Sequence, residues 1–184
     1  MTVMIGLLRG VNVGGHGKIA MSELRDICLS LKLRNPATYI QSGNVVFGVT
    51  ETELTKLTGR IESAIEARCG FRPCVMLRTA KEMRDIVQCN PFAGRPAIEP
   101  AKLAVSFLAT PLTPDLSRRI EDIHVGAEEI HCAKRELYIY FSDGQGRSKL
   151  PAVLERTLNI PATARNWNTV LKLLAMTTEV EALG

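Results

Sequence analysis

The sequence predicts an α+β protein of two lobes, because the same order of strands and helices occurs twice along its 184 residues. Three patterns carry this prediction: short apolar runs typical of strands, apolar residues at helical spacing, and pairs of short strands joined by turns. In each half the elements follow one another as βαββαβ, which is the order of the ferredoxin-like fold. We expect an N-terminal lobe over 1–78. Residues 79–184 are expected to hold a linking helix, the second lobe and a C-terminal helix.

The first lobe begins with a mostly apolar segment, as in a central strand. Thr50-Glu51-Thr52-Glu53 has the spacing of a capping box, which marks the start of a helix, and Gly70 is suited to ending that helix. The elements expected here are, in order, a strand over 3–11, a helix over 21–31, a hairpin of strands 38–42 and 45–49, the capped helix, and a strand over 73–78.

The second part begins with a linking helix, which Thr79 and Glu82 cap and Asn90-Pro91 ends. Thr113 followed by Pro114 marks another helix start. The two halves agree in the order of elements and not in their residues. The further elements expected are a strand over 103–109, a helix from 113, a hairpin of strands 129–133 and 136–142, a helix from 148, a strand over 162–167 and a final helix.

Composition is that of an ordinary globular protein, with 46% hydrophobic and 23% charged residues. The formal charge is +4, and the basic residues are scattered rather than gathered in a stripe, so the sequence does not favour nucleic-acid binding. No apolar stretch approaches the roughly 20 residues that a membrane span needs. No signal peptide is recognisable either. We therefore expect a cytoplasmic protein without a membrane partner.

The five cysteines are odd in number and contain no C-x-x-C pair. Cys28 and Cys89 fall on the apolar faces of expected helices, so reduced and mostly buried thiols are expected. The three histidines have no zinc-like spacing with the cysteines. The sequence predicts no metal site and no cofactor.

A glycine-rich segment follows the first strand and runs from Gly10 to Lys18. It matches neither the Walker A pattern nor G-x-G-x-x-G. One interpretation is a flexible connection with positive φ at Gly14, Gly15 or Gly17. The other is a loop that holds an anion or polar ligand, with Asn12 nearby and charge from Arg9 and Lys18.

Arg9 lies at the end of an apolar strand, on the face expected for Ile5 and Leu7. A guanidinium buried there needs a carboxylate, a carbonyl or a ligand as partner, because an unpaired buried charge is costly. A structural acid and a bound phosphate or carboxylate both satisfy this requirement. Both interpretations stay open.

Two further polar clusters follow apolar strands. Gln41-Ser42-Gly43-Asn44 is typical of a turn, and a ligand-binding role is the alternative. In Arg165-Asn166-Trp167-Asn168, Arg165 and Trp167 are expected on one face of a strand, and Asn168 is placed to cap the last helix. Either Trp167 only seals the core, or Arg165 and the helix start form a second site facing an anion.

Tyr138 and Tyr140 are expected on one face of a strand and are the one pair suited to stacking on bases. No sequence typical of an RNA-recognition motif accompanies them. A position under a helix or at a subunit contact is the favoured interpretation, and a homodimer stays open.

Four separated blocks resemble the domain-of-unknown-function 1697 family of bacterial proteins: Leu7 to Gly15, Thr38 to Phe47, Asn90 to Phe92, and Arg165 to Val170. The resemblance runs nearly from end to end. Ala20 is a departure, because the family pattern has proline there. The resemblance implies a small cytosolic α+β protein and supplies no catalytic residues.

The leading hypothesis is a binding module for a small anionic ligand or a protein partner. The alternatives are an enzyme acting on a phosphate- or nucleotide-containing substrate, and nucleic-acid binding. The enzyme alternative predicts that Arg9, Gln41, Asn44 and Arg165 converge on one cleft. The candidate ligand-binding residues are Arg9, Asn12, Gly14, Gly15, Lys18, Gln41, Ser42, Asn44, Arg165, Asn166 and Asn168.

Overall fold

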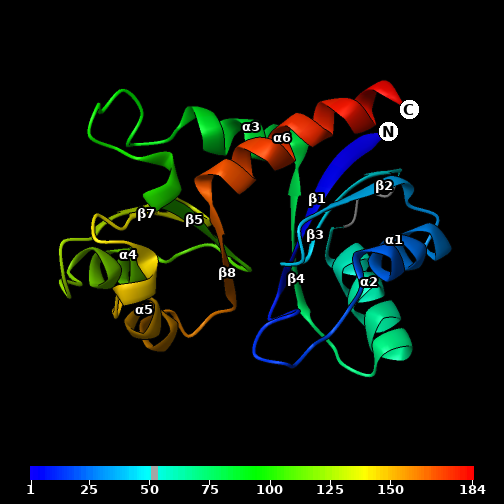
Figure 1. The fold of residues 1–184 in the computed structure, drawn as a ribbon, viewed down its shortest axis with the longest axis horizontal. Helices are drawn as coiled ribbons and strands as arrows, with labels where there is room; N and C mark the ends of the chain where they lie inside the picture. The colour runs from blue at the N-terminus through cyan, green and yellow to red at the C-terminus, as the bar shows by residue number, and fades with distance from the viewer. Residues whose placement is uncertain (51–53) are drawn as a thin grey trace. The chain divides into compact units, whose positions relative to one another are not determined.

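The fold contains two four-stranded antiparallel sheets, each part of a βαββαβ unit, as the sequence predicted (Figure 1). The computed structural model describes residues 1–50 and 54–184, so most of the capping box expected at Thr50 to Glu53 lies outside the described residues. The chain divides into two compact units, one of residues 1–85 with 172–184 and the other of 86–171.

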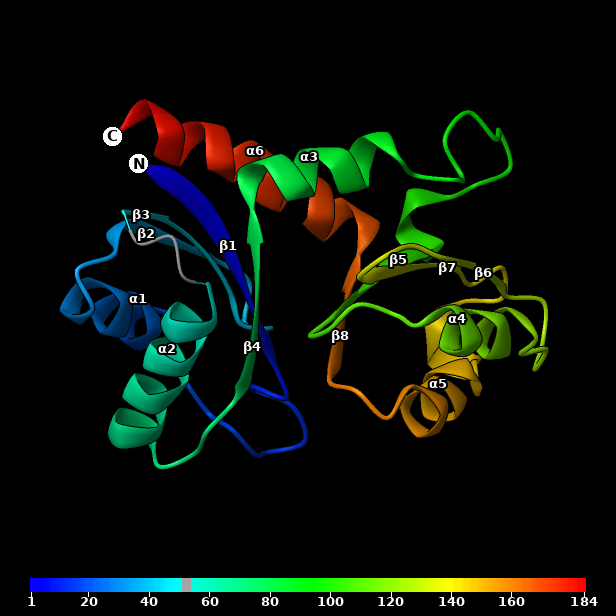
Figure 2. The same cartoon turned by 180° about the vertical axis from the view of Figure 1, so that it is seen from behind.

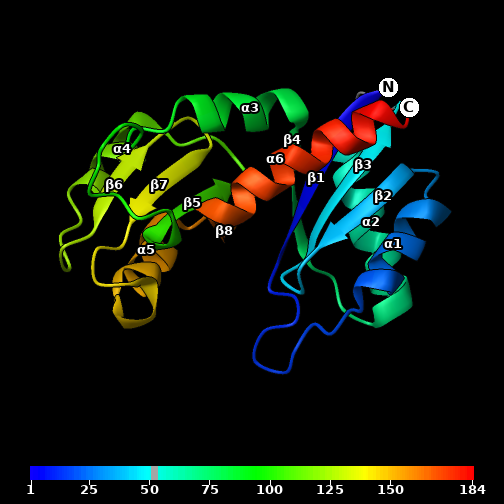
Figure 3. The same ribbon diagram turned by 45° about the horizontal axis from the view of Figure 1, so that its top comes forward.

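The sheet of the first unit has the strand order β2-β3-β1-β4, with β2 at its edge (Figure 3). Both sheet neighbours of β1 run antiparallel to it, as the βαββαβ connection requires. The elements are β1 (Thr2–Arg9), α1 (Met21–Ser30), β2 (Arg34–Tyr39), β3 (Asn44–Val49), α2 (Leu54–Cys69) and β4 (Cys74–Thr79).

Helices α1 and α2 cover one face of this sheet (Figure 2). Met4 and Leu8 of β1 point to that face and pack in a core with Leu24 of α1 and Ile61 of α2. The alternating residues Val3, Ile5 and Leu7 are also buried. Burial on both faces explains why β1 has a continuous apolar sequence instead of an alternating one.

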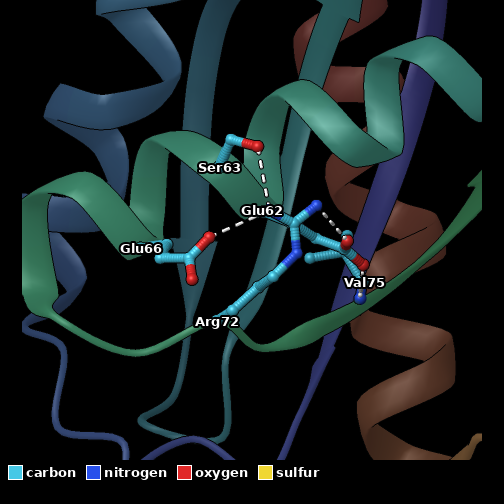
Figure 4. Close-up of polar contacts among 5 residues, drawn as sticks. All are labelled: Glu62, Ser63, Glu66, Arg72 and Val75. Atoms are coloured by element: carbon cyan, nitrogen blue, oxygen red, sulfur yellow. Dashed lines mark hydrogen bonds and ion pairs between the residues drawn. The ribbon is translucent and has the colours of Figure 1, made fainter.

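A single arginine organises the connection from α2 to β4 (Figure 4). Arg72 donates to Ser63 Oγ at 2.9 Å, to Glu66 Oε2 at 3.0 Å and to Glu62 Oε2 at 3.2 Å. The other oxygen of Glu62 accepts the backbone N–H of Val75 at 3.0 Å. These bonds join the second half of α2 to the start of β4. Gly70, with φ of 76°, ends α2 as predicted.

The second unit repeats the plan, with strand order β6-β7-β5-β8. Leu137 and Ile139 of β7 pack with Leu150 and Leu154 of α5 on one face of its sheet. The elements are η1 (Pro100–Lys102), β5 (Leu103–Leu108), α4 (Pro114–Glu121), β6 (Glu129–Cys132), β7 (Glu136–Tyr140), η2 (Gln145–Arg147), α5 (Leu150–Leu158) and β8 (Ala162–Asn166).

The last residues of α3 (Ala80–Gln88) and the connector after it cover the opposite face of this second sheet. The hydroxyl of Tyr138 donates to the carbonyl of Ile86 at 2.8 Å, and that of Tyr140 donates to the carbonyl of Ala97 at 3.2 Å. Phe92 packs edge-on against His131, with ring centroids 5.1 Å apart. Tyr138 and Tyr140 are 3% and 7% exposed, so neither can stack on a base in this arrangement.

Each unit's last strand leads into a capped helix, α3 (Ala80–Gln88) or α6 (Trp167–Ala182). Thr79 and Glu82 form the predicted capping box, with the Glu82 N–H donating to Thr79 Oγ1 at 3.0 Å. The side-chain oxygen of Asn166 accepts the N–H of Asn168 at 3.0 Å, so Asn166 caps α6. The prediction that Asn168 caps this helix is therefore wrong by two residues.

Three local expectations are corrected by the structure. β2 begins at Arg34 and ends at Tyr39 instead of spanning 38–42, because Ile40 takes a positive φ of 48° that no strand continues. Trp167 opens α6, so it does not alternate with Arg165 along a strand. Cys89 is exposed because α3 ends one residue before it.

Candidate functional site

The glycine-rich segment after β1 forms an ordered loop. Gly10, Gly14, Gly15 and Gly17 all have positive φ, which bears out the backbone geometry expected for its glycines. Val13 and His16 pair as an isolated β-bridge around Gly14 and Gly15. A Cβ on Gly17 would lie 2.6 Å from the carbonyl oxygen of Gly10, so the two ends of the loop approach each other too closely for any other residue.

Asn12 holds this loop in place from inside. Its side-chain Nδ2 donates to the carbonyls of Ile19 at 3.0 Å and Gln41 at 2.8 Å, and its Oδ1 accepts the N–H of Ile19 at 3.0 Å. Its backbone N–H donates to Gly17 at 3.0 Å. Asn12 thus ties both ends of the loop to the β2–β3 turn, which lies 29 residues away along the chain.

The β2–β3 turn is stabilised by Asn44 and by a close approach at Gly43. Asn44 is fully buried, and its Nδ2 donates to the carbonyl of Tyr39 and to Ser42 Oγ, each at 2.9 Å. A Cβ on Gly43 would lie 2.4 Å from the side chain of Val11, and φ there is 77°. Asn44 and Gly43 are therefore required by the packing of the turn.

The loop, the turn and the start of α1 surround an open hollow of about 930 Å³. We call this the α1 hollow. Two cations, Lys18 and Arg25, line it, and the Arg25 guanidinium donates to Thr38 Oγ1 at 2.6 Å. The full lining is Asn12, Gly15, Lys18, Ile19, Ala20, Met21, Ser22, Glu23, Arg25 and Gln41.

Helix α1 begins in the α1 hollow without a side-chain cap. Ala20 is its N-cap residue, with φ of −70° and ψ of 144°, and has no hydrogen-bonding side chain to offer. The first N–H groups of a helix have no partner within the helix, and the helix dipole makes this end positive.

Glu23 is the one acid in the lining, and it is paired. The Nε of Arg68 on α2 lies 3.3 Å from Glu23 Oε1. Burial raises the pKa of the neighbouring Cys69, and the charge of Glu23 raises it further. The lining therefore presents two cations against one acid whose charge is shared with Arg68.

The structure brings together four of the predicted residues in the α1 hollow, namely Asn12, Gly15, Lys18 and Gln41. Gly14 is exposed at the loop tip. Ser42 and Asn44 lie inside the β2–β3 turn, where Ser42 accepts a hydrogen bond from Asn44. Among the residues that the structure describes, none of these three lines the α1 hollow.

Arg9 does not occupy the buried position that the sequence suggested. It is exposed at the end of β1, where it pairs across the sheet with Cys74 of β4 and lowers the pKa of that thiol, against a larger raising effect of burial. β1 ends at Arg9, two residues before the expected end of the strand, and its buried run stops at Leu8, so the argument from a buried charge does not apply to Arg9.

The polar cluster from Arg165 to Asn168 belongs to the second unit. Arg165 is 7% exposed and donates to Thr163 Oγ1 at 2.7 Å and to the carbonyl of Ala164 at 2.9 Å. Burial lowers its pKa to about 10. Trp167 is buried, Asn166 caps α6 and Asn168 is exposed.

Sequence reasoning missed two arginines. Arg78 is 1% exposed on β4 and donates to the carbonyl of Leu77 at 2.9 Å, the same bond to the preceding residue that Arg165 makes. Aligning the halves on their helix caps, Thr79 and Asn166, would have matched Arg78 with Arg165. Arg25 follows Ser22 by three residues, the helical spacing that places both on one face.

Other kinds of site find little support among the described residues. No three His, Cys, Asp or Glu side chains there gather as metal ligands. None of the described helices combines the length and apolar character needed to cross a bilayer. All five cysteines are free, with Cys28 fully buried and its pKa raised to about 12 by that burial.

Comparisons with known proteins agree with this fold. A family model described as "Protein of unknown function (DUF1697)" matches residues 1–138. The solved structure of conserved bacterial protein SP0830 from Streptococcus pneumoniae is similar, with a TM-score of 0.77 and 23% sequence identity over 96% of this chain and 98% of that one. At that identity the likeness shows the fold alone. None of the curated proteins compared with the chain matches it. With three quarters of its length matched by the family model, the chain belongs to the DUF1697 family.

Proposed function

We propose that the protein is a binding module for a small anionic ligand, held in the α1 hollow. The observation that carries the proposal is the meeting of two cationic side chains, Lys18 and Arg25, in one hollow from opposite sides of a helix start. A volume of about 930 Å³ accommodates a small metabolite.

Charge and hydrogen-bonding capacity both favour an anion. Lys18 is exposed, whereas Arg25 is half-buried and donates to Thr38 Oγ1. An arginine fixed by one hydrogen bond keeps its other N–H groups for a phosphate or carboxylate. The uncapped start of α1 adds backbone N–H donors with a favourable dipole.

The Asn12 hydrogen bonds reduce the cost of binding. They fix the loop that carries Lys18 and the turn that carries Gln41 before any ligand arrives. A preorganised site loses less conformational entropy on binding than a flexible loop does.

We include a cytoplasmic location in this proposal, because all five cysteines are free.

The test titrates the protein with inorganic phosphate and, separately, with pyrophosphate at low ionic strength. Calorimetry measures the binding in each titration. Replacing Lys18 by Gln removes one charge from a side chain that forms no hydrogen bond or ion pair in the described residues. We expect Lys18→Gln to weaken pyrophosphate binding about tenfold. Arg25→Gln is expected to weaken it at least as much.

Lys134→Gln is the matched control, because Lys134 is also exposed and lies in the second unit. It should leave binding unchanged. Equal affinity of the unmodified protein, Lys18→Gln and Arg25→Gln for both anions would contradict the proposal. Measuring whether pyrophosphate is hydrolysed in the same samples separates a binding module from an enzyme.

A further inference from the structure

A second hollow, of about 520 Å³, lies in the second unit, between the segment 125–128 and the loop from Phe141 to Lys149. We call it the α5 hollow. Its volume falls in the range of small-molecule sites. All of its lining residues belong to one compact unit, so its geometry does not depend on the first unit.

Three cations from separate segments line the α5 hollow: Lys102 before β5, Arg147 in η2 and Lys149 at the start of α5. The Nζ of Lys102 lies 2.7 Å from Glu99 Oε1, and the charge of Asp143 also acts on it. These two acids offset the charge of Lys102. Arg147 and Lys149 are exposed and form no ion pair among the described residues. These two side chains supply cations without an ion pair, in a lining that also holds the carboxylates of Glu128 and Asp143.

A buried carboxylate oxygen lies beside them. The hydroxyl of Ser148 donates to Glu128 Oε1 and accepts the N–H of Leu150 at 3.0 Å. The other oxygen, Glu128 Oε2, is buried and has no hydrogen-bond partner in the described part of the chain. A buried carboxylate oxygen without a donor is costly, so it indicates a place for a donor from outside the chain.

Gly126 makes room for this carboxylate. A Cβ at position 126 would lie 2.6 Å from Glu128 Oε2, closer than any stable contact. The obstacle would be the end of a flexible side chain, so an alanine there would move Glu128 without disturbing the backbone.

We propose that the α5 hollow binds a phosphomonoester that also carries a hydroxyl group, the chemistry of a polyol or sugar phosphate. Arg147 and Lys149 bind the phosphate oxygens, and the ligand's hydroxyl donates to Glu128 Oε2. Glu128 also repels an anion that offers no donor, so it selects hydroxylated phosphates over simple phosphate.

The experiment compares glycerol 3-phosphate with inorganic phosphate at matched ionic strength, using amide NMR shifts and calorimetry. Binding should shift the amide signals of Gly126, Gly144 and Gly146, which locates it in the α5 hollow. The double variant Arg147→Gln/Lys149→Gln should raise the Kd for both probes at least about tenfold. Arg119→Gln/Lys134→Gln removes the same charge from exposed positions of the same unit and should change neither Kd.

Two variants test the role of Glu128. Glu128→Gln should tighten inorganic phosphate binding, because it removes a repelling charge, and lower the preference for glycerol 3-phosphate at least about threefold. Gly126→Ala should lower the same preference without a change in charge. The proposal fails if neither probe shifts these amides. It also fails if Glu128→Gln weakens both probes equally, which a structural role alone would explain.

Discussion

The two units differ most where the first strand of each leads into the first helix. In the first unit, residues 10–20 connect β1 to α1 and include the glycine-rich loop. Helix α1 begins at Met21, and its N-cap residue Ala20 offers no side-chain cap. In the second unit only residues 109–113 separate β5 from α4. There Thr113 Oγ1 accepts the N–H of Leu116 at 3.2 Å, and Asp115 lies in the first turn.

This difference shows that one fold accommodates two kinds of helix start at the same position. The start of α4 is completed by its own side chains, as a helix start in a purely structural role requires. The start of α1 lies beside Lys18 and is left without a cap. The side chain of Asn12 spans this longer loop and forms two hydrogen bonds to the backbone of Ile19 at its far end.

The largest loss of stability is expected at the buried arginine that both units have in their last strand. Arg78 pairs with Ile5 and Arg165 pairs with Val105, so both arginines lie beside the central strand of their sheet, on the face opposite the paired helices. Arg78→Ala should lower the free energy of unfolding by about 3 kcal/mol, and Arg165→Ala by about 2 kcal/mol, because each removes a large buried side chain and its hydrogen bonds.

Urea unfolding, monitored through amide hydrogen exchange, measures the loss of stability in each unit separately. Arg119→Ala, an exposed position, is the control and should change stability by less than about 0.5 kcal/mol. If Arg78→Ala changed stability as little as Arg119→Ala does, Arg78 would not share the structural role of Arg165.

Exchanging the caps tests the difference between the units directly. Thr113→Ala should destabilise the second unit by about 1 kcal/mol and leave pyrophosphate binding unchanged. Ala20→Ser should stabilise the first unit by about 0.5–1 kcal/mol, because Ala20 already has the backbone geometry of an N-cap. The same change should weaken pyrophosphate binding severalfold, since the serine oxygen takes an N–H group that the anion would use. Thermal unfolding and calorimetry on the same samples check both; tighter binding by Ala20→Ser would refute the comparison.

A smaller effect is expected at Ile40, which has a φ of 48° and is 48% exposed. In the second unit the residue with the same φ is Asn159, a type that tolerates this conformation. Ile40→Asn should stabilise the protein by about 0.5 kcal/mol, and Asn159→Ile should cost about 1 kcal/mol. Midpoints of urea unfolding measure both changes, and a loss of stability in Ile40→Asn would show that the side chain of Ile40 outweighs its strain.

The smallest effect concerns the connector of the second unit. Arg95 forms two hydrogen bonds to Glu129, at 2.8 and 2.9 Å, and these lower the pKa of Glu129 below its usual 4.5. A lowered carboxyl pKa contributes stability above the unfolded value, and this is lost as pH falls through the folded value. Glu129→Gln should therefore speed hydrogen exchange at Ala93 and Arg95 at pH 7. Below the lowered pKa it should have no effect. A difference that persisted in acid would assign the effect to packing.

The local signals in the sequence were sufficient for the order of elements and most helix boundaries. Thr79 with Glu82, Thr113 with Pro114, and Gly70 each act on neighbouring backbone groups, so their roles follow from spacing. Boundaries failed where a local conformation overrode the pattern. Ile40 ends β2 although its residue type favours strands, and Trp167 begins a helix although it follows an alternating strand.

The candidate sites were only partly predictable, because short sequence patterns do not record which distant segments meet in the fold. Lys18 and Gln41 stood out because they border glycine turns. Arg25 lies on a helix with no unusual spacing, and its place in the α1 hollow depends on how the loop folds back. No motif marks the α5 hollow, since it forms from segments that meet only when β7 pairs with both β5 and β6.

By itself, the sequence determined two βαββαβ units, their turns and their helix caps, because periodicity and capping act over a few residues. Only the tertiary structure decided that Arg9 is exposed while Arg78 and Arg165 are buried, and that Asn12 reaches the carbonyl of Gln41. Burial and such contacts depend on strand register and on chain segments far apart in sequence, which no short pattern of residues records.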